Sequence, residues 1–495
     1  VAGRLEPTAG GALAQAALVP ATALSPLPEG MAFEQAAALP TAAGTAWLAL
    51  FGVGRLQAGQ RVLVHAGAGG VGSFAVQLAR QAGAQVKIKL WHAMGGARYE
   101  AITKGIAEGF AKENPGYTVE PLFSGSYAET VTKGIATIRA GDPPHILQVY
   151  EVGTQTMLDS GAFIPVTEVV KPGEIKWDDY FAPIMNYYTV GGKLSSMPFN
   201  SSTAILYYNK DAFKKAGLDP EKPPATYKDV EEMGRKILAS GAARGVITFG
   251  WPAWMFEQAF AYHNQLYANN ENGRKGRATQ ILFNGPFGVE VLTRWKKWAD
   301  EKLLMYGGRE YAPNKAFLSG EVAMLLQSTS QVTTIEKAAK FPVGTGFLPH
   351  LEGKPQGKSV IGGASLWVLK GKGRSPQELD AIAKFFKYIG QPEQSAKWHQ
   401  DTGYFPATHA SEKLLRDEGW FKKNPNHETA FKQIQAGPDT PATRGVLLGS
   451  FVQIRNLTDS ALEKTFSGKL SPQAALDEGA QEVNKVLEEY NRLQK

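Results

Sequence analysis

Charged residues are distributed unevenly along the chain, with an abrupt change in composition near residue 86. This break in composition constrains the fold more than any other feature. Residues 1–86 contain seven charged residues and no lysine, whereas the whole 495-residue chain contains 53 basic and 46 acidic residues. Lysines begin at Lys87 and recur to Lys495, while alanine becomes less frequent. The break predicts two segments of different origin joined near Gln85–Lys87. One protein with an alanine-rich first domain is the alternative.

The first segment contains a glycine-rich loop between two predicted elements. Arg61–Ala66 has the composition of a buried strand, and an apolar-periodic helix runs from Gly72 to about Gln81. Strand, glycine turn and helix are typical of a dinucleotide-binding fold, in which a pyrophosphate lies on the helix N-terminus. With Ala36–Trp47 and Gly59–Val64, this segment resembles the quinone-oxidoreductase branch of medium-chain dehydrogenases.

The same segment lacks most of what that family needs. An acidic residue about 20 residues after the glycines should contact the ribose, but the next predicted strand, Val86–Leu90, ends in Trp91-His92. The catalytic domain and the rest of the nucleotide-binding domain are also missing. We therefore interpret residues 1–86 as a partial Rossmann-like fragment outside the first lobe, with Arg61–Ala66 unpaired with Val86–Leu90. We expect no functional cofactor site at its vestigial loop glycines, Gly67, Gly69, Gly70 and Gly72.

Strands and helices alternate from Val86 onward, which predicts an α/β architecture with two lobes. A capping box at Thr226–Asp229 and the Ser471-Pro472 pair predict two further helix starts. The predicted elements near the break are strands at Val86–Leu90, Thr118–Leu122 and Ile146–Val149, and helices at Tyr99–Asn114 and Tyr127–Ala140.

Composition and motifs exclude several classes of function. The chain has no cysteine, which excludes disulfides and thiolate metal sites. It contains no HExxH, GxSxG, P-loop or metal-ligand cluster, so we predict neither an enzyme nor a metal site. The net charge of +7 is mild for this length and argues against nucleic acid as a partner. We also find no membrane-spanning apolar run and no targeting signal after Val1.

Residues 87–495 contain several recognisable blocks: Phe110–Pro115, Gln148–Thr154, Pro198–Thr203, Tyr207–Leu218, Ile361–Trp367, Trp398–Tyr404 and Gln453–Arg455. In these blocks, residues 87–495 resemble the extracytoplasmic glycerol-3-phosphate-binding proteins of ABC importers. The resemblance implies an α/β, two-lobe, type II-like solute-binding fold and a monomer. It also implies a periplasmic or extracytoplasmic membrane-associated location, with importer permease subunits as partners.

The same resemblance implies three crossings between the lobes. They are expected near Asn200–Ala204, Leu325–Thr329 and Ile361–Leu366. The implied domains are residues 87–200 and 329–361 for lobe one, and residues 204–325 and 366–495 for lobe two.

Four residues suit a phosphate ester between the lobes. Charge-assisted donors are needed for a phosphate. Arg455 offers a planar guanidinium, Ser202 and Ser328 offer hydroxyls, and Gly363 offers an approachable N–H group. The two serines and the glycine fall on the implied crossings. A cleft arginine is expected to contribute little to the stability of the fold.

Four further residues suit the glycerol part of the ligand. Glu151 follows a predicted strand and can accept hydrogen bonds from polyol hydroxyls. Trp251, Tyr127 and Tyr404 are candidates for an aromatic wall, with Trp254 as an equal alternative to Trp251.

The predicted function is capture of sn-glycerol 3-phosphate, or of a glycerophosphodiester such as glycerophosphocholine, for a membrane permease. Two alternatives remain open from the sequence. One is a quinone-type NAD(P)H oxidoreductase, which depends on residues 1–86 alone. The other is an oligosaccharide-binding protein of the same fold, which the tryptophans favour and Arg455 disfavours.

Overall fold

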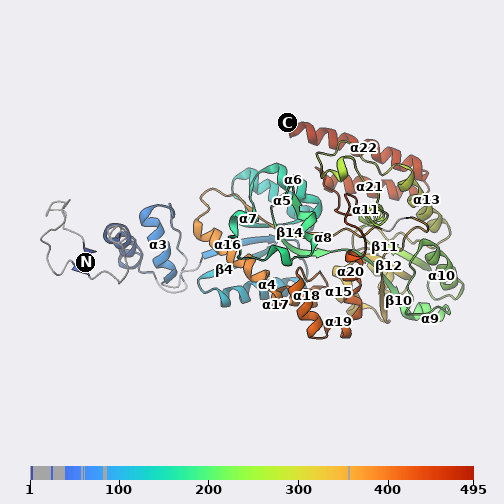
Figure 1. The fold of residues 1–495 in the computed structure, drawn as a ribbon, viewed down its shortest axis with the longest axis horizontal. Helices are drawn as coiled ribbons and strands as arrows, with labels where there is room; N and C mark the ends of the chain where they lie inside the picture. Colours follow the sequence, from blue (N-terminus) through green and yellow to red (C-terminus); the bar gives the residue numbers. More distant parts are fainter. Residues whose placement is uncertain are drawn as a thin grey trace.

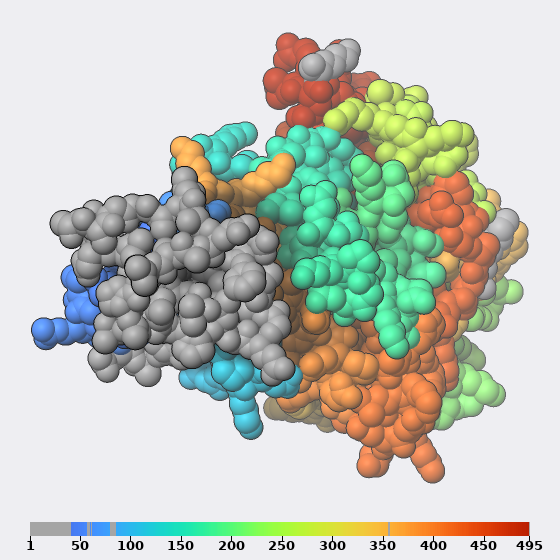
Figure 2. Space-filling view, turned by 60° about the vertical axis from the view of Figure 1, so that its left-hand side comes forward, coloured from blue at the N-terminus to red at the C-terminus, as the bar shows by residue number. Residues whose placement is uncertain are grey.

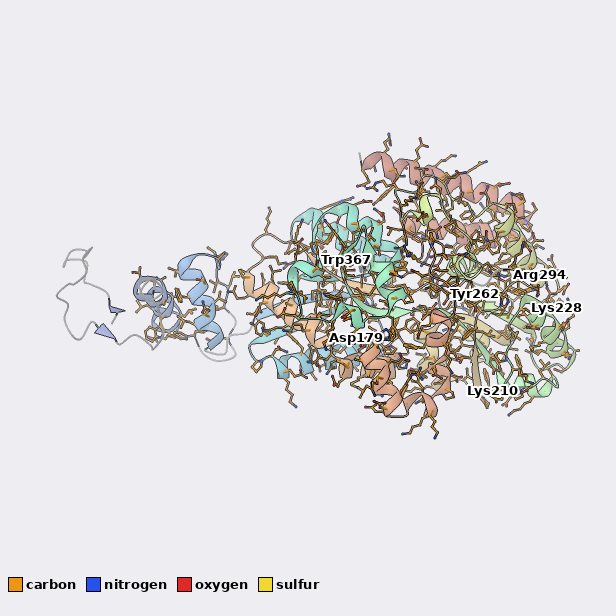
Figure 3. The ribbon with its side chains drawn as sticks, viewed as in Figure 1. Asp179, Lys210, Lys228, Tyr262, Arg294 and Trp367 are labelled. Carbon is orange, nitrogen blue, oxygen red and sulfur yellow. The ribbon has the colours of Figure 1, made fainter. Side chains whose placement is uncertain are left out.

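The computed structural model describes residues 2–3, 24–25, 39–56, 60, 62–81, 86–354 and 357–494. Two α/β lobes lie side by side, each built on a sheet covered by helices (Figure 1). Figure 3 shows Trp367 within lobe one and Tyr262 within lobe two. Among the described residues, no helix combines the length and the apolar character needed to cross a membrane.

The sheet of lobe one has the strand order β4-β3-β5-β14-β6, with β9 also paired to β14. β3 pairs in parallel with β4 and β5, whereas β14 runs antiparallel to β5, β6 and β9. These strands are β3 (Val86–His92), β4 (Tyr117–Phe123), β5 (Ile146–Tyr150), β6 (Phe163–Ile164), β9 (Met197–Ser202) and β14 (Gly362–Leu369).

The sheet of lobe two has the order β11-β12-β10-β13. β10 is buried on both faces, because Ile205 and Tyr207 pack into one apolar cluster while Leu206 and Tyr208 pack into another. The strands are β10 (Ala204–Asn209), β11 (Gly245–Phe249), β12 (Val322–Ser328) and β13 (Val343–Gly346). Two further strand pairs lie outside both sheets. In these, β1 (Ala2–Gly3) pairs with β2 (Leu24–Ser25), and β7 (Thr189–Val190) pairs with β8 (Lys193–Leu194).

The predicted helix starts are confirmed. Thr226 Oγ1 accepts from the Asp229 N–H at 3.0 Å, and Ser471 Oγ accepts from the Ala474 N–H at 3.3 Å.

The principal helices are α4 (Ala97–Glu113), α5 (Tyr127–Ala140), α6 (Thr154–Ser160), α8 (Ala182–Tyr188), α9 (Lys210–Lys215), α10 (Tyr227–Ala239), α11 (Pro252–Tyr262), α13 (Pro286–Asp300), α15 (Val332–Ala338), α16 (Pro376–Ile389), α17 (Pro392–Thr402), α18 (His409–Asp417), α20 (Thr429–Gln435), α21 (Phe451–Phe466) and α22 (Pro472–Leu493). Shorter helical segments are α7 (Val166–Val169), α12 (Asn269–Asn272), α14 (Asn314–Leu318), α19 (Trp420–Lys423), η5 (Glu151–Gly153), η6 (Trp177–Asp179), η7 (Thr329–Gln331) and η8 (Pro425–His427).

Segments far apart in the sequence share one surface of lobe one. Figure 2 shows teal residues just before and within α8 beside the orange segment that contains α17 and α18. The Phe181 N–H donates to the Ala407 carbonyl at 3.2 Å, and Tyr180 forms a β-bridge with Thr408. The C-terminal half therefore completes lobe one as well as lobe two.

The chain changes lobes at two of the three predicted places. β9 belongs to lobe one and β10 to lobe two, with only Thr203 between them, which confirms the first crossing. The chain enters β14 of lobe one at Gly362, so the third crossing is also correctly placed. The second is wrong, because the chain leaves the second sheet at Ser328 and returns to it in β13. The remaining change of lobe lies between α16, which packs on β3, and α21, which packs on α11 and α22.

The expected domain boundaries change accordingly. Residues 343–346 lie in the sheet of lobe two, although residues 329–361 were expected in lobe one. Residues 366–369 pair with β5, β6 and β9 in lobe one, although lobe two was expected from residue 366. Backbone pairing decides both cases, and single-strand patterns carry no information about which sheet a strand joins.

The N-terminal segment forms helices but not the predicted strand. Its helices are η3 (Leu39–Ala43), α2 (Gly44–Trp47), η4 (Leu48–Val53) and α3 (Gly70–Gln81). They share a small core of Ala46, Leu50, Leu56, Ala75 and Ala79. Arg61 lies outside the described residues, residues 62–64 belong to no strand, and Leu63 is 81% exposed. The predicted strand at 61–66 is therefore wrong for its described part.

Competition for sheet edges explains this result. β3 is paired with β4 along its whole length and with β5 at Leu90 and Trp91, so it is an inner strand of the sheet and not an edge strand. The predicted absence of pairing with Val86–Leu90 is thus confirmed for the described residues. Without a strand before it, the glycine-rich segment forms a turn at residues 65–68 and then enters α3 at Gly70, where a Cβ atom on Gly72 would lie 2.2 Å from the Ala66 carbonyl oxygen.

Candidate functional site

A single cavity between the lobes is lined by every residue expected in the binding site. The eight predicted residues are Tyr127, Glu151, Ser202, Trp251, Ser328, Gly363, Tyr404 and Arg455. Trp254, the predicted alternative to Trp251, also lines the cavity, together with four residues that were not predicted as site residues: Tyr150, Tyr311, Ser330 and Gly362.

Strand ends and helix starts place these side chains around the cavity. Tyr127 is the first residue of α5, behind the N-cap Ser126, and Glu151 directly follows β5. Ser202 and Ser328 end β9 and β12, the strands on either side of the lobe boundary. This matches the general rule that ligand sites of α/β folds lie beyond strand ends.

Arg455 is the electrostatic centre of the site. It projects from α21, and its side chain is 11% exposed. Nη1 donates to Glu151 Oε1 at 2.7 Å, while Nη2 and Nε donate to Glu257 Oε2 at 2.8 and 3.2 Å. Glu257 lies on α11 and is absent from the cavity lining. The guanidinium therefore joins two buried carboxylates from different lobes.

Burial and the neighbouring charges shift the pKa values of Arg455 and Glu257 in opposite directions. Burial disfavours the charged guanidinium, but Glu257 and Glu151 outweigh it and raise the pKa of Arg455 above its usual value. Burial raises the pKa of Glu257, and Arg455 only partly offsets this effect. The ring of Phe451 also lies 5.1 Å from the guanidinium carbon, within the range of a cation–π contact.

A chain of side-chain hydrogen bonds orients two tyrosine hydroxyls at the cavity. The Ala93 N–H donates to Gln148 Oε1 at 2.7 Å, and Gln148 Nε2 donates to Asn200 Oδ1 at 2.8 Å. Asn200 Nδ2 then donates to the Tyr127 hydroxyl at 2.8 Å, which lies 3.0 Å from the Tyr404 hydroxyl. Burial raises the pKa of both tyrosines, so their hydroxyls stay protonated at neutral pH and can donate.

Aromatic rings form the apolar walls. Tyr127 stacks on Tyr150 with centroids 5.2 Å apart, and Tyr404 stacks on Trp398 at 5.8 Å. On the other side, Trp251 packs edge-on against Tyr311 at 5.4 Å.

Trp251 and Trp254 both line the cavity, so the choice left open between them was not exclusive. Trp251 has φ +56° and precedes α11, so its backbone turns just before the helix. Trp254 is 5% exposed, and its indole Nε1 is buried without a protein hydrogen-bond partner in the described structure. A buried indole donor usually has a partner, so this N–H is a further candidate donor to a ligand.

Gly363 has a backbone role that other residues cannot fill. Its φ is +94°, and a Cβ atom there would lie 1.9 Å from the Asn200 carbonyl oxygen. The pairing of β9 with β14 shifts register just after this point, between Ala364 and Ser365. The close approach to Asn200 leaves Gly363 in the lining of the cavity, where its N–H group stays a predicted donor.

Some of the unpredicted residues had a sequence signal and others had none. Tyr150 ends the strand before Glu151, and Gly362 and Ser330 lie within two residues of predicted site residues. Tyr311 lies in a turn region without a motif, so only the fold reveals it. Asn200 is fully buried behind the cavity, and its role as the partner of Tyr127 depends on a contact 73 residues away in sequence. In the described part of the chain, no group of three or more His, Asp or Glu side chains is placed to hold a metal ion.

Comparisons with known proteins place this geometry in a family. Residues 105–429 match the model of the bacterial extracellular solute-binding proteins. The sn-glycerol-3-phosphate-binding periplasmic protein UgpB of Salmonella paratyphi A is 39% identical over 423 residues, covering 84% of this chain and 95% of that protein. UgpB of Escherichia coli K12 is 40% identical over 413 residues, covering 82% and 93%.

Solved structures show the same fold. UgpB of Mycobacterium tuberculosis in complex with glycerophosphocholine superposes with a TM-score of 0.69 at 19% identity, covering 82% of this chain and 99% of that chain. The cyclic alpha-maltosyl-1,6-maltose binding protein of Arthrobacter globiformis gives a TM-score of 0.67 at 21% identity, covering 81% and 99%. With its family match and its relatives at 39–40% identity, the chain belongs to the bacterial extracellular solute-binding proteins, the non-enzymatic, extracytoplasmic binding components of ABC importers.

Proposed function

We propose that this protein captures sn-glycerol 3-phosphate, or a glycerophosphodiester, and delivers it to the permease of an ABC importer. The observation that carries the proposal is the shared cavity, in which a buried guanidinium, hydroxyls and aromatic rings surround one space. The names of the Salmonella and Escherichia coli relatives support this ligand class. The protein acts as a monomer in this proposal.

Arg455 and nearby hydroxyls bind the phosphate in the proposed complex. An arginine has five N–H donors, and the carboxylates of Glu151 and Glu257 occupy three of those of Arg455. The two remaining N–H groups, the hydroxyls of Ser202 and Ser328 and the N–H of Gly363 supply donors to a phosphate.

The glycerol part contacts Glu151 and the aromatic walls. Glu151 Oε1 already accepts from Arg455 at 2.7 Å, and the carboxylate has further lone pairs for ligand hydroxyls. Tyr127 and Tyr404 hold their hydroxyls in fixed positions through Asn200, and Trp251 covers the carbon skeleton.

A diester has room beside the same site. A second cavity shares Tyr127, Trp251 and Arg455 with the first and extends to Glu310 and Asp459. Burial raises the pKa of both carboxyl groups, that of Asp459 to about 6. The alcohol substituent of a diester fits there, and carboxylates near aromatic rings suit a cationic substituent such as choline. The glycerophosphocholine complex of the Mycobacterium tuberculosis relative supports this alternative.

Parallel calorimetric titrations test the proposal. We expect heat from sn-glycerol 3-phosphate or glycerophosphocholine, and none from maltose or NADPH. Binding of maltose alone would favour the oligosaccharide alternative, because a neutral sugar does not need the charge of Arg455. Binding of NADPH would instead point to residues 1–86.

A further inference from the structure

We propose that Glu257 takes up a proton when the phosphate ester binds beside Arg455. This inference rests on the proposed function, because it concerns an anionic ligand in the described cavity. Glu257 does not line that cavity, so it acts on the ligand only through Arg455. It is therefore a positioning residue rather than a ligand contact.

The charge balance of the cluster is the first step. With both carboxylates ionised, Glu151, Glu257 and Arg455 together carry one net negative charge. All three side chains are buried, with exposures of 5%, 3% and 11%, so solvent screens them weakly. A phosphate dianion that enters this cluster meets negative charge unless one carboxylate is neutralised.

Geometry selects Glu257 as the group that changes its protonation state. Glu151 lines the cavity, so ligand hydroxyls can donate hydrogen bonds to its carboxylate. Glu257 lies behind Arg455 and gains no donor from the ligand. Both of its bonds from Arg455 end on Oε2, so a proton taken from solvent can reside on Oε1.

In the described part of the chain, Arg455 is the cation whose charge favours the ionised form of Glu257. The groups that act on it or feel its charge are Arg455 on α21, Glu151 after β5, Tyr187 on α8 and Tyr267 before α12. Burial raises the pKa of Glu257 before any ligand arrives, and the phosphate raises it further. Because the ligand raises this pKa, binding consumes a proton and tightens as pH falls.

Calorimetry in two buffers of different ionisation enthalpy tests the inference. The probe is sn-glycerol 3-phosphate at pH 8, where a phosphate monoester with a second pKa of roughly 6 is already a dianion. We expect the protein to take up protons on binding, with one proton per bound ligand as the limit. Affinity should then rise by up to about tenfold per pH unit between pH 8.5 and 7, the limit for linkage to one proton.

The variant Glu257→Gln should bind with almost no proton uptake and with an affinity that is flat over this range. At pH 8 it should bind at least as tightly as the parent, because the amide resembles the protonated carboxyl in charge. Asp459→Asn is the matched control, since Asp459 is a neighbouring acidic residue on α21 with a pKa of about 6. It should retain the proton uptake.

Each contrary result has a distinct meaning. Ligand binding by the parent without proton uptake overturns the inference and leaves the proposed function intact. Uptake that persists in Glu257→Gln, or disappears in Asp459→Asn, also overturns the assignment to Glu257. Failure of the parent to bind sn-glycerol 3-phosphate refutes the monoester form of the proposed function and this inference with it.

Discussion

Replacing Arg455 with methionine should destabilise the protein, contrary to the expectation that a cleft arginine contributes little to the fold. Methionine keeps most of the buried stem but removes the guanidinium. The change leaves Glu151 and Glu257 buried without their cation. Removing one partner of a buried ion pair typically costs about 3–5 kcal/mol, because the remaining charge is uncompensated.

The loss of folding stability in Arg455→Met should depend on pH in a defined direction. Burial already raises the pKa of Glu257 in the folded parent, and removing Arg455 raises it further. Protons therefore bind more tightly to the folded than to the unfolded variant. The destabilisation should be full at pH 7–8 and should shrink as pH falls through the raised folded-state pKa of Glu257, because the buried carboxyl is then neutral.

Urea unfolding of the parent and of Arg455→Met at pH 8 and pH 5, without ligand, measures this effect. A double variant, Arg455→Met with Glu257→Gln, should recover part of the lost stability at pH 8, since it removes one stranded charge. The matched control is Arg309→Met, which removes a partly exposed arginine from its pair with Glu463. That change should cost no more than about 1 kcal/mol. Equal stability of Arg455→Met and the parent at pH 8 would refute the reasoning.

Three further changes probe the site and its hinges. Glu151→Gln should weaken binding of sn-glycerol 3-phosphate more than binding of inorganic phosphate in parallel titrations, because it replaces an acceptor for the glycerol hydroxyls with a donor. Gly363→Ala should lower the free energy of unfolding by more than about 2 kcal/mol in urea titrations, since φ is +94° and the new Cβ atom meets the Asn200 carbonyl oxygen; an unchanged midpoint would contradict this. Saturating ligand should reduce the radius of gyration measured by small-angle scattering through rotation about Thr203 and the other hinge segments, and an unchanged radius would argue against closure.

The sequence predicted local structure well because local signals determine it. The helix at Tyr127–Ala140 has the predicted bounds, and β3, β4 and β5 differ from prediction by two residues or fewer at each end. Capping at Thr226 and Ser471 depends on residues three positions away, so sequence alone reveals it. The eight site residues came from the family resemblance rather than from these local patterns.

Non-local pairing explains what the sequence did not predict. β13 is the short segment Val-Gly-Thr-Gly, which carries no local signal for either lobe, and its pairing with β10 assigns it to lobe two. Arg61–Ala66 has the composition of a strand, yet residues 62–64 have no sheet to join. No sequence motif marks Glu257. Its contact with Arg455 exists because α11 and α21 pack together.

The positions of the tyrosine hydroxyls connect the fold to selectivity. Tyr127 begins α5 and Tyr404 follows α17, yet their hydroxyls lie 3.0 Å apart because Asn200 fixes the first of them. Asn200 lies in β9, two residues before the chain passes Ser202 and leaves lobe one at Thr203. The same short segment therefore forms a hinge and orients donors at the cavity. Donors that are fixed before the ligand arrives lose less entropy on binding, so the site is best suited to a ligand that presents several acceptor oxygens at once, as a phosphate ester does.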